Sequence, residues 1–202
     1  MNLPNEKVEF VPLQKTEILA KRKASFGSNL RLSYDEPAMF LRGWKTHLFD
    51  EWGRPYLDAY NNVPHVGHSH PRIRNAALEQ LKKLNSNTRY LHPKQSDLAE
   101  SILSKLPETF KVCYFVNSGS EANELALRLA REHTKAKGMI TMDHGYFGNT
   151  TGAIDISAYK FNKPGGVGQP DWLELVEIPD DYRGAYKKED PNRGEKFAGQ
   201  IN

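Results

Sequence analysis

The sequence contains a single cysteine, Cys113, among its 202 residues. One cysteine cannot form an internal disulfide, so a disulfide-stapled fold is excluded and a reducing, cytoplasmic location is expected. Residues 1–11 alternate charged and apolar side chains and lack the continuous apolar core of a secretory signal. No uncharged apolar run approaches the roughly 18 residues that suggest a membrane span. We therefore expect no membrane partner.

The sequence also lacks a large excess of charge of one sign, because it has 28 basic and 25 acidic residues and a net charge of +3. The charges are interspersed, and no basic block alternates with aromatic residues, so a nucleic-acid partner is not expected. Hydrophobic residues make up 38% of the chain, and apolar runs recur to about residue 178. This composition is typical of a folded globular protein and not of a disordered one.

Apolar periodicity predicts short strands and two helices in the first part of the chain. Residues 47–50 and 55–58 are apolar runs on either side of a turn that contains Gly53, which favours a β-hairpin. Pro71 opens a helix with apolar residues at helical spacing. A second helix is expected at 96–106, ended by the proline that follows.

Strands and a helix alternate in the next part of the chain. Residues 112–116 form an apolar, β-prone run that predicts a buried strand, and a helix follows directly and ends near Thr134. Further strands are expected at 138–142 and 173–178. The strand–helix–strand order is a βαβ unit and predicts a parallel sheet in an α/β fold. From residue 179 onward the chain is polar, and no closing element is predicted.

A turn with the residues of an anion site lies between the strand at 112–116 and its helix. It reads Asn117-Ser118-Gly119-Ser120, and the helix that follows offers unpaired N–H groups and a partial positive charge at its N-terminus. Gly119 permits close approach of a phosphate to the backbone, and the two serines can add hydroxyl donors. The alternative is a plain N-capped helix, because serine is a favoured cap. The turn matches neither the Walker loop nor the dinucleotide fingerprint.

A second loop, at residues 143–150, follows another strand of the predicted sheet. Ligands of open α/β sheets lie beyond the carboxyl ends of the strands, so this loop and the Ser118–Ser120 turn are expected at one crevice. Tyr146 or Phe147 can stack on a flat cofactor ring, or both can simply anchor the loop.

Three histidines lie in the segment 65–71, which reads HVGHSHP. Their spacing is not that of a zinc finger or of HExxH, and no cysteine completes a ligand set, so no metal site is predicted. The structural interpretation is that His70 and Ser69 cap the helix that begins at Pro71, with Gly67 as a turn residue. Arg89 and Tyr90, in the polar loop 85–93, are candidates to contact an anionic substrate or a partner subunit, or they belong to a solvated loop.

Taken together, the motifs resemble the class III pyridoxal-5′-phosphate (PLP)-dependent aminotransferases of fold type I. The matching stretches read LFDEWGRPYLD at 48–58, HVGHSHP at 65–71, NSGSEANELALRLAR at 117–131 and DHGYFG at 143–148. Within that family, three segments are most similar to the ethanolamine-phosphate and phosphohydroxylysine phospho-lyases. They read NSNTRYLH at 85–92, DISAYKF at 155–161 and PDDYRGAY at 179–186.

The resemblance implies an N-terminal portion of the fold type I architecture. Residues 1–65 correspond to an N-terminal segment with a β-hairpin that is part of the small domain. Residues 66–202 correspond to the first part of the PLP-binding large domain, whose sheet is mostly parallel. The family's Schiff-base lysine and the aspartate that pairs with the pyridine nitrogen are expected beyond residue 202. No catalytic residue of the family is therefore assigned in this chain, and the chain by itself is expected to be inactive.

The resemblance also implies roles for residues of the two loops. Gly119 and Ser120 match the positions that hold the PLP phosphate, with Ser118 beside them, and Tyr146 matches the ring that stacks on the cofactor. The family usually has histidine where this chain has Phe147, so the contact made by that histidine is absent here.

On the substrate side of the pocket, the resemblance assigns Asn62 and Val63. It implies a small-molecule amine substrate and a homodimer for the full-length protein. Three functions follow: transamination of an amine or amino acid, phosphate elimination from a phosphorylated amine such as O-phosphoethanolamine, or a non-catalytic fragment or module.

Overall fold

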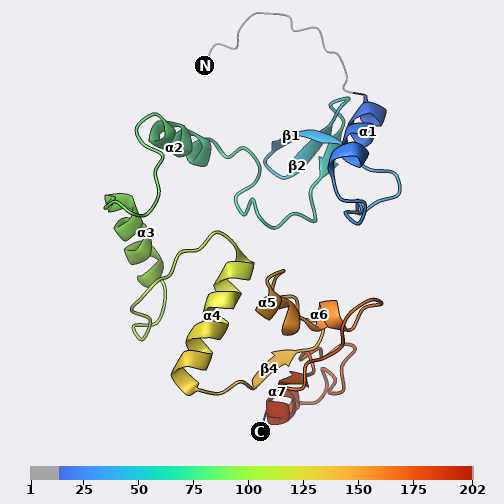
Figure 1. The fold of residues 1–202 in the computed structure, drawn as a ribbon, viewed down its shortest axis with the longest axis vertical. Helices are drawn as coiled ribbons and strands as arrows, with labels where there is room; N and C mark the ends of the chain where they lie inside the picture. The colour runs from blue at the N-terminus through green and yellow to red at the C-terminus, as the bar shows by residue number, and fades with distance from the viewer. Residues whose placement is uncertain (1–13, 202) are drawn as a thin grey trace, which may run out of the picture. The chain divides into compact units, whose positions relative to one another are not determined.

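The computed structural model describes residues 14–201, so the expectation for residues 1–11 lies outside the described residues. The chain divides into two compact units, one ending at Leu91 and the other beginning at His92 (Figure 1). We call their described parts the first unit (14–91) and the second unit (92–201), and each is described by itself. The boundary expected at 65/66 refers to the complete family fold and stays a prediction. Among the described residues, no helix is both long and apolar enough to cross a membrane.

The first unit holds a three-stranded antiparallel sheet in the order β1-β2-β3. Its strands are β1 (Phe40–Trp44), β2 (His47–Asp50) and β3 (Pro55–Leu57), and it also contains the helices α1 (Lys15–Ser25) and α2 (Pro71–Leu81). The predicted hairpin is confirmed, because His47 pairs with Leu57 and Phe49 with Pro55. The sequence did not indicate β1, since Arg42 and Gly43 interrupt its apolar run.

The turn between β2 and β3 is organised by the buried carboxylate of Asp50. It accepts hydrogen bonds from the Trp52 and Arg54 N–H groups at 2.9 Å each, from Arg54 Nε at 2.6 Å and from the Tyr56 hydroxyl at 3.0 Å. Burial on its own raises the pKa of Asp50, but these hydrogen bonds outweigh it and lower the pKa from 3.8 to about 2. The carboxylate is therefore ionised at neutral pH and holds the turn closed.

The second unit contains a parallel pair of strands, β4 (Met139–Met142) and β5 (Leu173–Val176), in which Met139 pairs with Leu173 and Met142 with Val176. The parallel sheet predicted from the sequence is thus confirmed, although two short helices connect its strands. The helices of this unit are α3 (Pro93–Leu103), α4 (Gly119–Thr134), α5 (Thr151–Asp155), α6 (Ala158–Phe161) and α7 (Arg193–Ala198), followed by the 3₁₀ helix η1 (Gly199–Ile201).

The buried strand predicted at 112–116 is not formed. Within residues 14–201 this segment pairs with no other strand, and Val112, Tyr114 and Phe115 are exposed. A strand exists only through hydrogen bonds to a neighbour, so an apolar β-prone run is insufficient where the described chain supplies no neighbour.

The helix expected at 96–106 is present as α3 but begins and ends earlier. Pro93 occupies its first turn, where a missing N–H costs no hydrogen bond, and the His92 side chain accepts a hydrogen bond from the Lys94 N–H at 3.3 Å. Beyond Leu103 the chain continues in tighter turns, in which the Leu106 N–H donates to the Leu103 carbonyl at 3.1 Å.

The expectation of no closing element after residue 179 is wrong. α7 buries Phe197, whose ring meets Tyr186 edge-on with the centroids 4.9 Å apart. Lys196 also forms a 2.6 Å ion pair with Asp190. A single buried aromatic on a six-residue helix leaves no periodic pattern, which is why the sequence did not indicate it.

The core of the second unit lies where α4, α6 and β5 meet. Its buried members are Leu127, Ile156, Ala158, Phe161 and Leu173. Figure 1 shows α4 alongside α5, and the loop at 143–150 lies between β4 and α5 in the sequence. Leu127 of α4 is a member of this core and Phe147 of the loop packs against it, so the core holds the helix and the loop in one packed body.

Candidate cofactor site

The N-terminus of α4 carries a variant of the capping box, in which the glutamate accepts from the N–H of the residue before the N-cap. The Ser118 hydroxyl accepts a hydrogen bond from the Glu121 N–H at 3.2 Å, and the Glu121 carboxylate accepts one from the Asn117 N–H at 2.6 Å. The capping interpretation is thus correct for Ser118. The Gly119 and Ser120 N–H groups occupy the first two helical positions, where no intrahelical acceptor exists. Gly119 is exposed, and a Cβ on it would meet no other atom within 4 Å, so no side chain crowds the first residue of the helix.

The loop 143–150 is fastened to α4 by three side chains of that helix. Ser120 Oγ accepts from the Asn149 N–H at 3.1 Å, Asn123 Nδ2 donates to the Phe147 carbonyl at 2.7 Å, and Glu124 Oε2 accepts from the Thr150 hydroxyl at 2.6 Å. The structure therefore brings the two loops singled out in the sequence into direct contact, at the carboxyl end of β4.

Gly148 makes the close approach of the loop to the helix possible. Its φ is 137°, and a Cβ there would overlap the side chain and backbone of Ser120. Only glycine combines this backbone conformation with that contact. The Ser120 hydroxyl is consequently oriented by the loop, at the residue whose N–H lies in the first turn of α4.

The two aromatic residues of the loop differ in their surroundings. Phe147 packs against the core, and its N–H donates to Ser157 Oγ at 2.9 Å, so it anchors the loop. Tyr146 is 50% exposed and meets Tyr159 edge-on, with the centroids 6.0 Å apart. Of the two candidate stacking residues, Tyr146 is the one with a ring face free to contact a ligand.

Two lysines place positive charge beside this aromatic pair. Lys160 Nζ lies 5.3 Å from the centroid of Tyr146, and Lys163 Nζ lies 3.3 Å from that of Tyr159. Hydrogen bonding to Lys163 lowers the pKa of the Tyr159 hydroxyl. Together with the positive end of the α4 dipole, these charges favour an anionic ligand at the site.

Asn62 and Val63 lie in the first unit, so they are described apart from the α4 site. Both are exposed, and Val63 lines a cavity of about 490 Å³ together with the segment 64–70 and Arg74 of α2. Arg89 hydrogen-bonds to Asn87 within its own loop. Contact of the 85–93 loop with a ligand stays a prediction.

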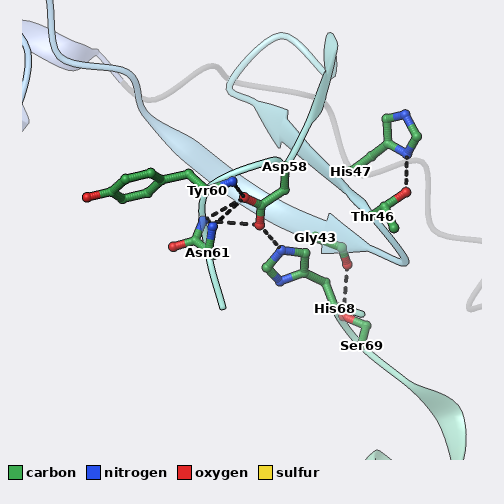
Figure 2. Close-up of polar contacts among 8 residues, drawn as sticks. All are labelled: Gly43, Thr46, His47, Asp58, Tyr60, Asn61, His68 and Ser69. Atoms are coloured by element: carbon green, nitrogen blue, oxygen red, sulfur yellow. Dashed lines mark hydrogen bonds and ion pairs between the residues drawn. The ribbon is translucent and has the colours of Figure 1, made fainter. Parts of the chain in front are cut away.

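The capping role predicted for His70 and Ser69 is wrong. His70 precedes α2, but its side chain makes no capping hydrogen bond, and the Ser69 hydroxyl donates to the Gly43 carbonyl at 2.9 Å (Figure 2). The turn role of Gly67 is confirmed by its φ of 87° and by the 2.7 Å hydrogen bond from its N–H to the Pro64 carbonyl. In residues 14–201 no three His, Cys, Asp or Glu side chains are grouped as metal ligands.

Sequence reasoning missed Asn123 and Glu124, which hold the loop to the helix. Asn123 precedes Leu127 and Ala130 by four and seven residues, so it lies on the apolar face of α4. A polar side chain at an apolar-face position indicates a buried hydrogen-bond partner, and this signal was available in the sequence.

The family described as Aminotransferase class-III matches residues 34–198 of this chain. The alanine–glyoxylate aminotransferase 2-like protein of Drosophila melanogaster is 42% identical over 193 residues, covering 94% of this chain and 39% of that protein. Ethanolamine-phosphate phospho-lyase homolog 1 of Caenorhabditis elegans is 44% identical over 177 residues, covering 87% of this chain and 38% of that protein. The chain thus spans about two fifths of the length of these relatives.

Solved structures show the same fold. A phospholyase from Arthrobacter in complex with phosphoethanolamine is 37% identical with a TM-score of 0.77, covering 91% of this chain and 43% of that one. A taurine:2-oxoglutarate aminotransferase from Bifidobacterium kashiwanohense, in complex with PLP and glutamate, is 20% identical with a TM-score of 0.77 and shows likeness of fold alone. The match covers 94% of this chain and 44% of the aminotransferase chain.

The chain belongs to the class III aminotransferase family, whose members are PLP-dependent aminotransferases and phospho-lyases. The α/β architecture expected from the sequence, part of the PLP-dependent transferase fold type I, is confirmed by these structural neighbours.

Proposed function

We propose that this chain forms the phosphate-binding and ring-stacking part of a PLP-dependent enzyme of the aminotransferase type, acting on a small-molecule amine or amino acid. One observation carries the proposal: the free N–H groups at the start of α4 are joined, through the Ser120–Asn149 hydrogen bond of 3.1 Å, to the loop that presents Tyr146. PLP carries a phosphate joined to its aromatic ring through one CH2–O link, which suits such a pair of neighbouring features.

The residues present fit the cofactor. The Gly119 and Ser120 N–H groups lie in the first turn of α4, where an anion is stabilised, and the Ser120 hydroxyl, held by the Asn149 N–H, is a further candidate donor to a phosphate. Ser118 serves chiefly to cap the helix and so contributes by orienting it. Tyr146 would stack on the pyridine ring. PLP supplies an electron sink for the bond being broken next to the amine nitrogen, and the residues named here bind and orient it.

Asn62 and Val63 are proposed to contact the substrate, as the family resemblance implies. For the whole protein we propose a homodimer, as the family resemblance implies, and a cytoplasmic location, as the lone cysteine suggests.

A second function, phosphate elimination from a phosphorylated amine such as O-phosphoethanolamine, has its own support. The Caenorhabditis elegans relative at 44% identity is a phospho-lyase homolog, and the Arthrobacter structure at 37% identity is a phospholyase that holds phosphoethanolamine. The positive charge of Lys160 and Lys163 near Tyr146 suits a substrate that carries its own phosphate, in addition to the phosphate of PLP.

The cofactor proposal is tested by titrating the purified chain with PLP and with pyridoxal, which has the same ring but no phosphate. We expect PLP to bind at least about tenfold more tightly, since charge-assisted hydrogen bonds to the phosphate are lost with pyridoxal. Intact mass after borohydride reduction counts PLP attached to lysines, so that this reaction is subtracted. Equal affinity for the two compounds would refute the proposed phosphate site.

The stacking role of Tyr146 is tested in the same titration. Tyr146→Ala is expected to weaken PLP binding about tenfold and Tyr146→Phe to leave it nearly unchanged, because the ring face carries the contact. Tyr182→Ala is the matched control, since Tyr182 is 82% exposed in the same unit. Equal affinities of the Tyr146→Ala and Tyr182→Ala chains for PLP would show that Tyr146 does not stack on the cofactor.

The reaction type is tested on the whole protein, since this chain by itself is expected to be inactive, by supplying PLP and O-phosphoethanolamine and following two products. Release of inorganic phosphate indicates phosphate elimination, and amino transfer to an added 2-oxo acid indicates transamination. A non-catalytic fragment produces neither, even where PLP binds.

A further inference from the structure

The segment 59–67 of the first unit begins and ends at one side-chain hydrogen bond. Asp58 Oδ2 and His68 Nε2 lie 2.6 Å apart, and their side chains are only 5% and 20% exposed (Figure 2). A short, largely buried hydrogen bond between a carboxylate and an imidazole is stronger than an exposed one. We call this pair the Asp58–His68 clasp.

Asp58 also organises the first turn of the segment. Its Oδ1 accepts hydrogen bonds from the Tyr60 N–H at 3.2 Å, the Asn61 N–H at 2.9 Å and Asn61 Nδ2 at 3.0 Å (Figure 2). The Asn61 backbone hydrogen bond and the His68 side chain hold the pKa of Asp58 well below its usual range. One carboxylate thus fixes both the direction in which the segment departs and the residue at which it returns.

The returning end of the segment is held against the β1–β2 hairpin. The backbone of His68 exchanges two hydrogen bonds with Lys45, at 3.1 and 2.7 Å. Two glycines make room for this contact. A Cβ on Gly43 would lie 2.6 Å from the His68 ring, and a Cβ on Gly67, whose φ is 87°, would lie 2.8 Å from the Lys45 carbonyl oxygen.

The middle of the segment contrasts with its ends. Asn62 and Val63 are exposed, Val63 to 86%. The Asn62 side chain makes no hydrogen bond within the described first unit, and the Val63 side chain is apolar. Val63 nevertheless lines the cavity of about 490 Å³ that the segment forms with α2. The position of these two side chains is therefore determined by the ends of the segment.

We infer that Asp58 and His68 are positioning residues: the clasp closes the segment 59–67 and so fixes where Asn62 and Val63 are presented. The inference rests on the proposed function for its consequence, because the substrate role of Asn62 and Val63 is part of that proposal. The clasp acts through the backbone of the segment, and neither Asp58 nor His68 is assigned a contact with substrate or cofactor.

Amide hydrogen exchange of the full 202-residue chain tests the clasp. His68→Ala is expected to speed exchange in the segment 59–67 about tenfold, the effect of losing one charge-assisted hydrogen bond. His68→Gln is expected to restore exchange to within about threefold of the parent chain, because the glutamine amide can donate to Asp58 as the imidazole does. His65→Ala is the matched control, since His65 is an exposed histidine of the same segment.

Three outcomes would overturn the inference. Unchanged exchange of residues 59–67 in His68→Ala would show that the clasp does not hold the segment. Equal acceleration across β2 and β3 would make His68 a support of the whole sheet, with no local positioning role. Failure of His68→Gln to restore protection would show that the hydrogen bond to Asp58 is not what slows exchange in the segment.

Failure of the clasp and failure of the proposed function are separable. The same samples are titrated with PLP, whose proposed site lies in the second unit. A parent chain that binds no PLP refutes the proposed function while the exchange result still decides the clasp. A chain that binds PLP but shows no change in exchange refutes the clasp alone.

Discussion

Replacing Asn123 with alanine is expected to release the site loop from α4. Asn123 Nδ2 donates to the Phe147 carbonyl at 2.7 Å in a partly buried position, across 24 residues of sequence. Alanine leaves this carbonyl without its donor, and an unsatisfied buried polar group costs about 1–3 kcal/mol. The free energy of unfolding of the second unit should fall by that amount.

The same substitution should weaken cofactor binding. Phe147 is bonded to Tyr146, so a loop released at Phe147 no longer holds the Tyr146 ring in one place. If about 1.4 kcal/mol must be spent to restore the bound geometry, the affinity for PLP falls about tenfold. Urea unfolding followed by circular dichroism measures the first effect, and PLP titration measures the second.

Asn162→Ala is the matched control, because Asn162 is an exposed asparagine at the end of α6 in the same unit. Equal unfolding midpoints for Asn123→Ala and Asn162→Ala would refute the argument that this hydrogen bond holds the loop. Lower stability with unchanged PLP affinity would separate the loop from the cofactor site.

Three further predictions concern the core, the loop and the turn of the first unit. Leu173→Ala, at a side chain 1% exposed, should lower the free energy of unfolding by about 2–5 kcal/mol in urea titrations, and a loss below about 1 kcal/mol would contradict the assigned core. Gly148→Ala should reduce both stability and PLP affinity, because its Cβ overlaps Ser120 at a φ of 137°; wild-type affinity would show that the loop need not approach the helix. The pKa of Asp50 is lower in the folded chain than its ordinary 3.8, so its contribution is complete above pH 3.8 and is lost as the pH falls towards about 2. The stability difference between the parent chain and Asp50→Asn should therefore shrink over that range, and a constant difference would show that the Asp50 charge does not hold the turn.

Elements whose hydrogen bonds are local were predictable from neighbouring residues. Ser118 and Glu121 mark the start of α4 by a variant of the capping box, and the αL conformation of Lys135, with φ 57°, ends the helix where the apolar pattern ends. The 112–116 segment shows the limit of the same reasoning. Its β-prone composition is real, but strand pairing depends on a neighbour that local sequence cannot supply.

The candidate site divides in the same way. Residue types singled out the turn with Ser118, Gly119 and Ser120 and the aromatic pair Tyr146 and Phe147, because a helix N-terminus and an aromatic loop residue have chemistry that is visible in a short motif. The family resemblance then favoured Tyr146. The choice between Tyr146 and Phe147 as the free aromatic needed the structure, since it depends on which ring packs against the core.

By itself, the sequence determined the family from several short motifs, the α/β class from the order of its apolar runs, and the start of α4 from residues within one turn, because each of these signals is written in neighbouring residues. Only the tertiary structure decided that Asn123, Glu124 and Ser120 bind the site loop and that Asp58 and His68 close the segment 59–67. These contacts join residues that are 10 to 29 positions apart. Such pairs form only when packing of the core or the hairpin repays the entropy of closing the intervening chain, and that balance depends on the whole fold.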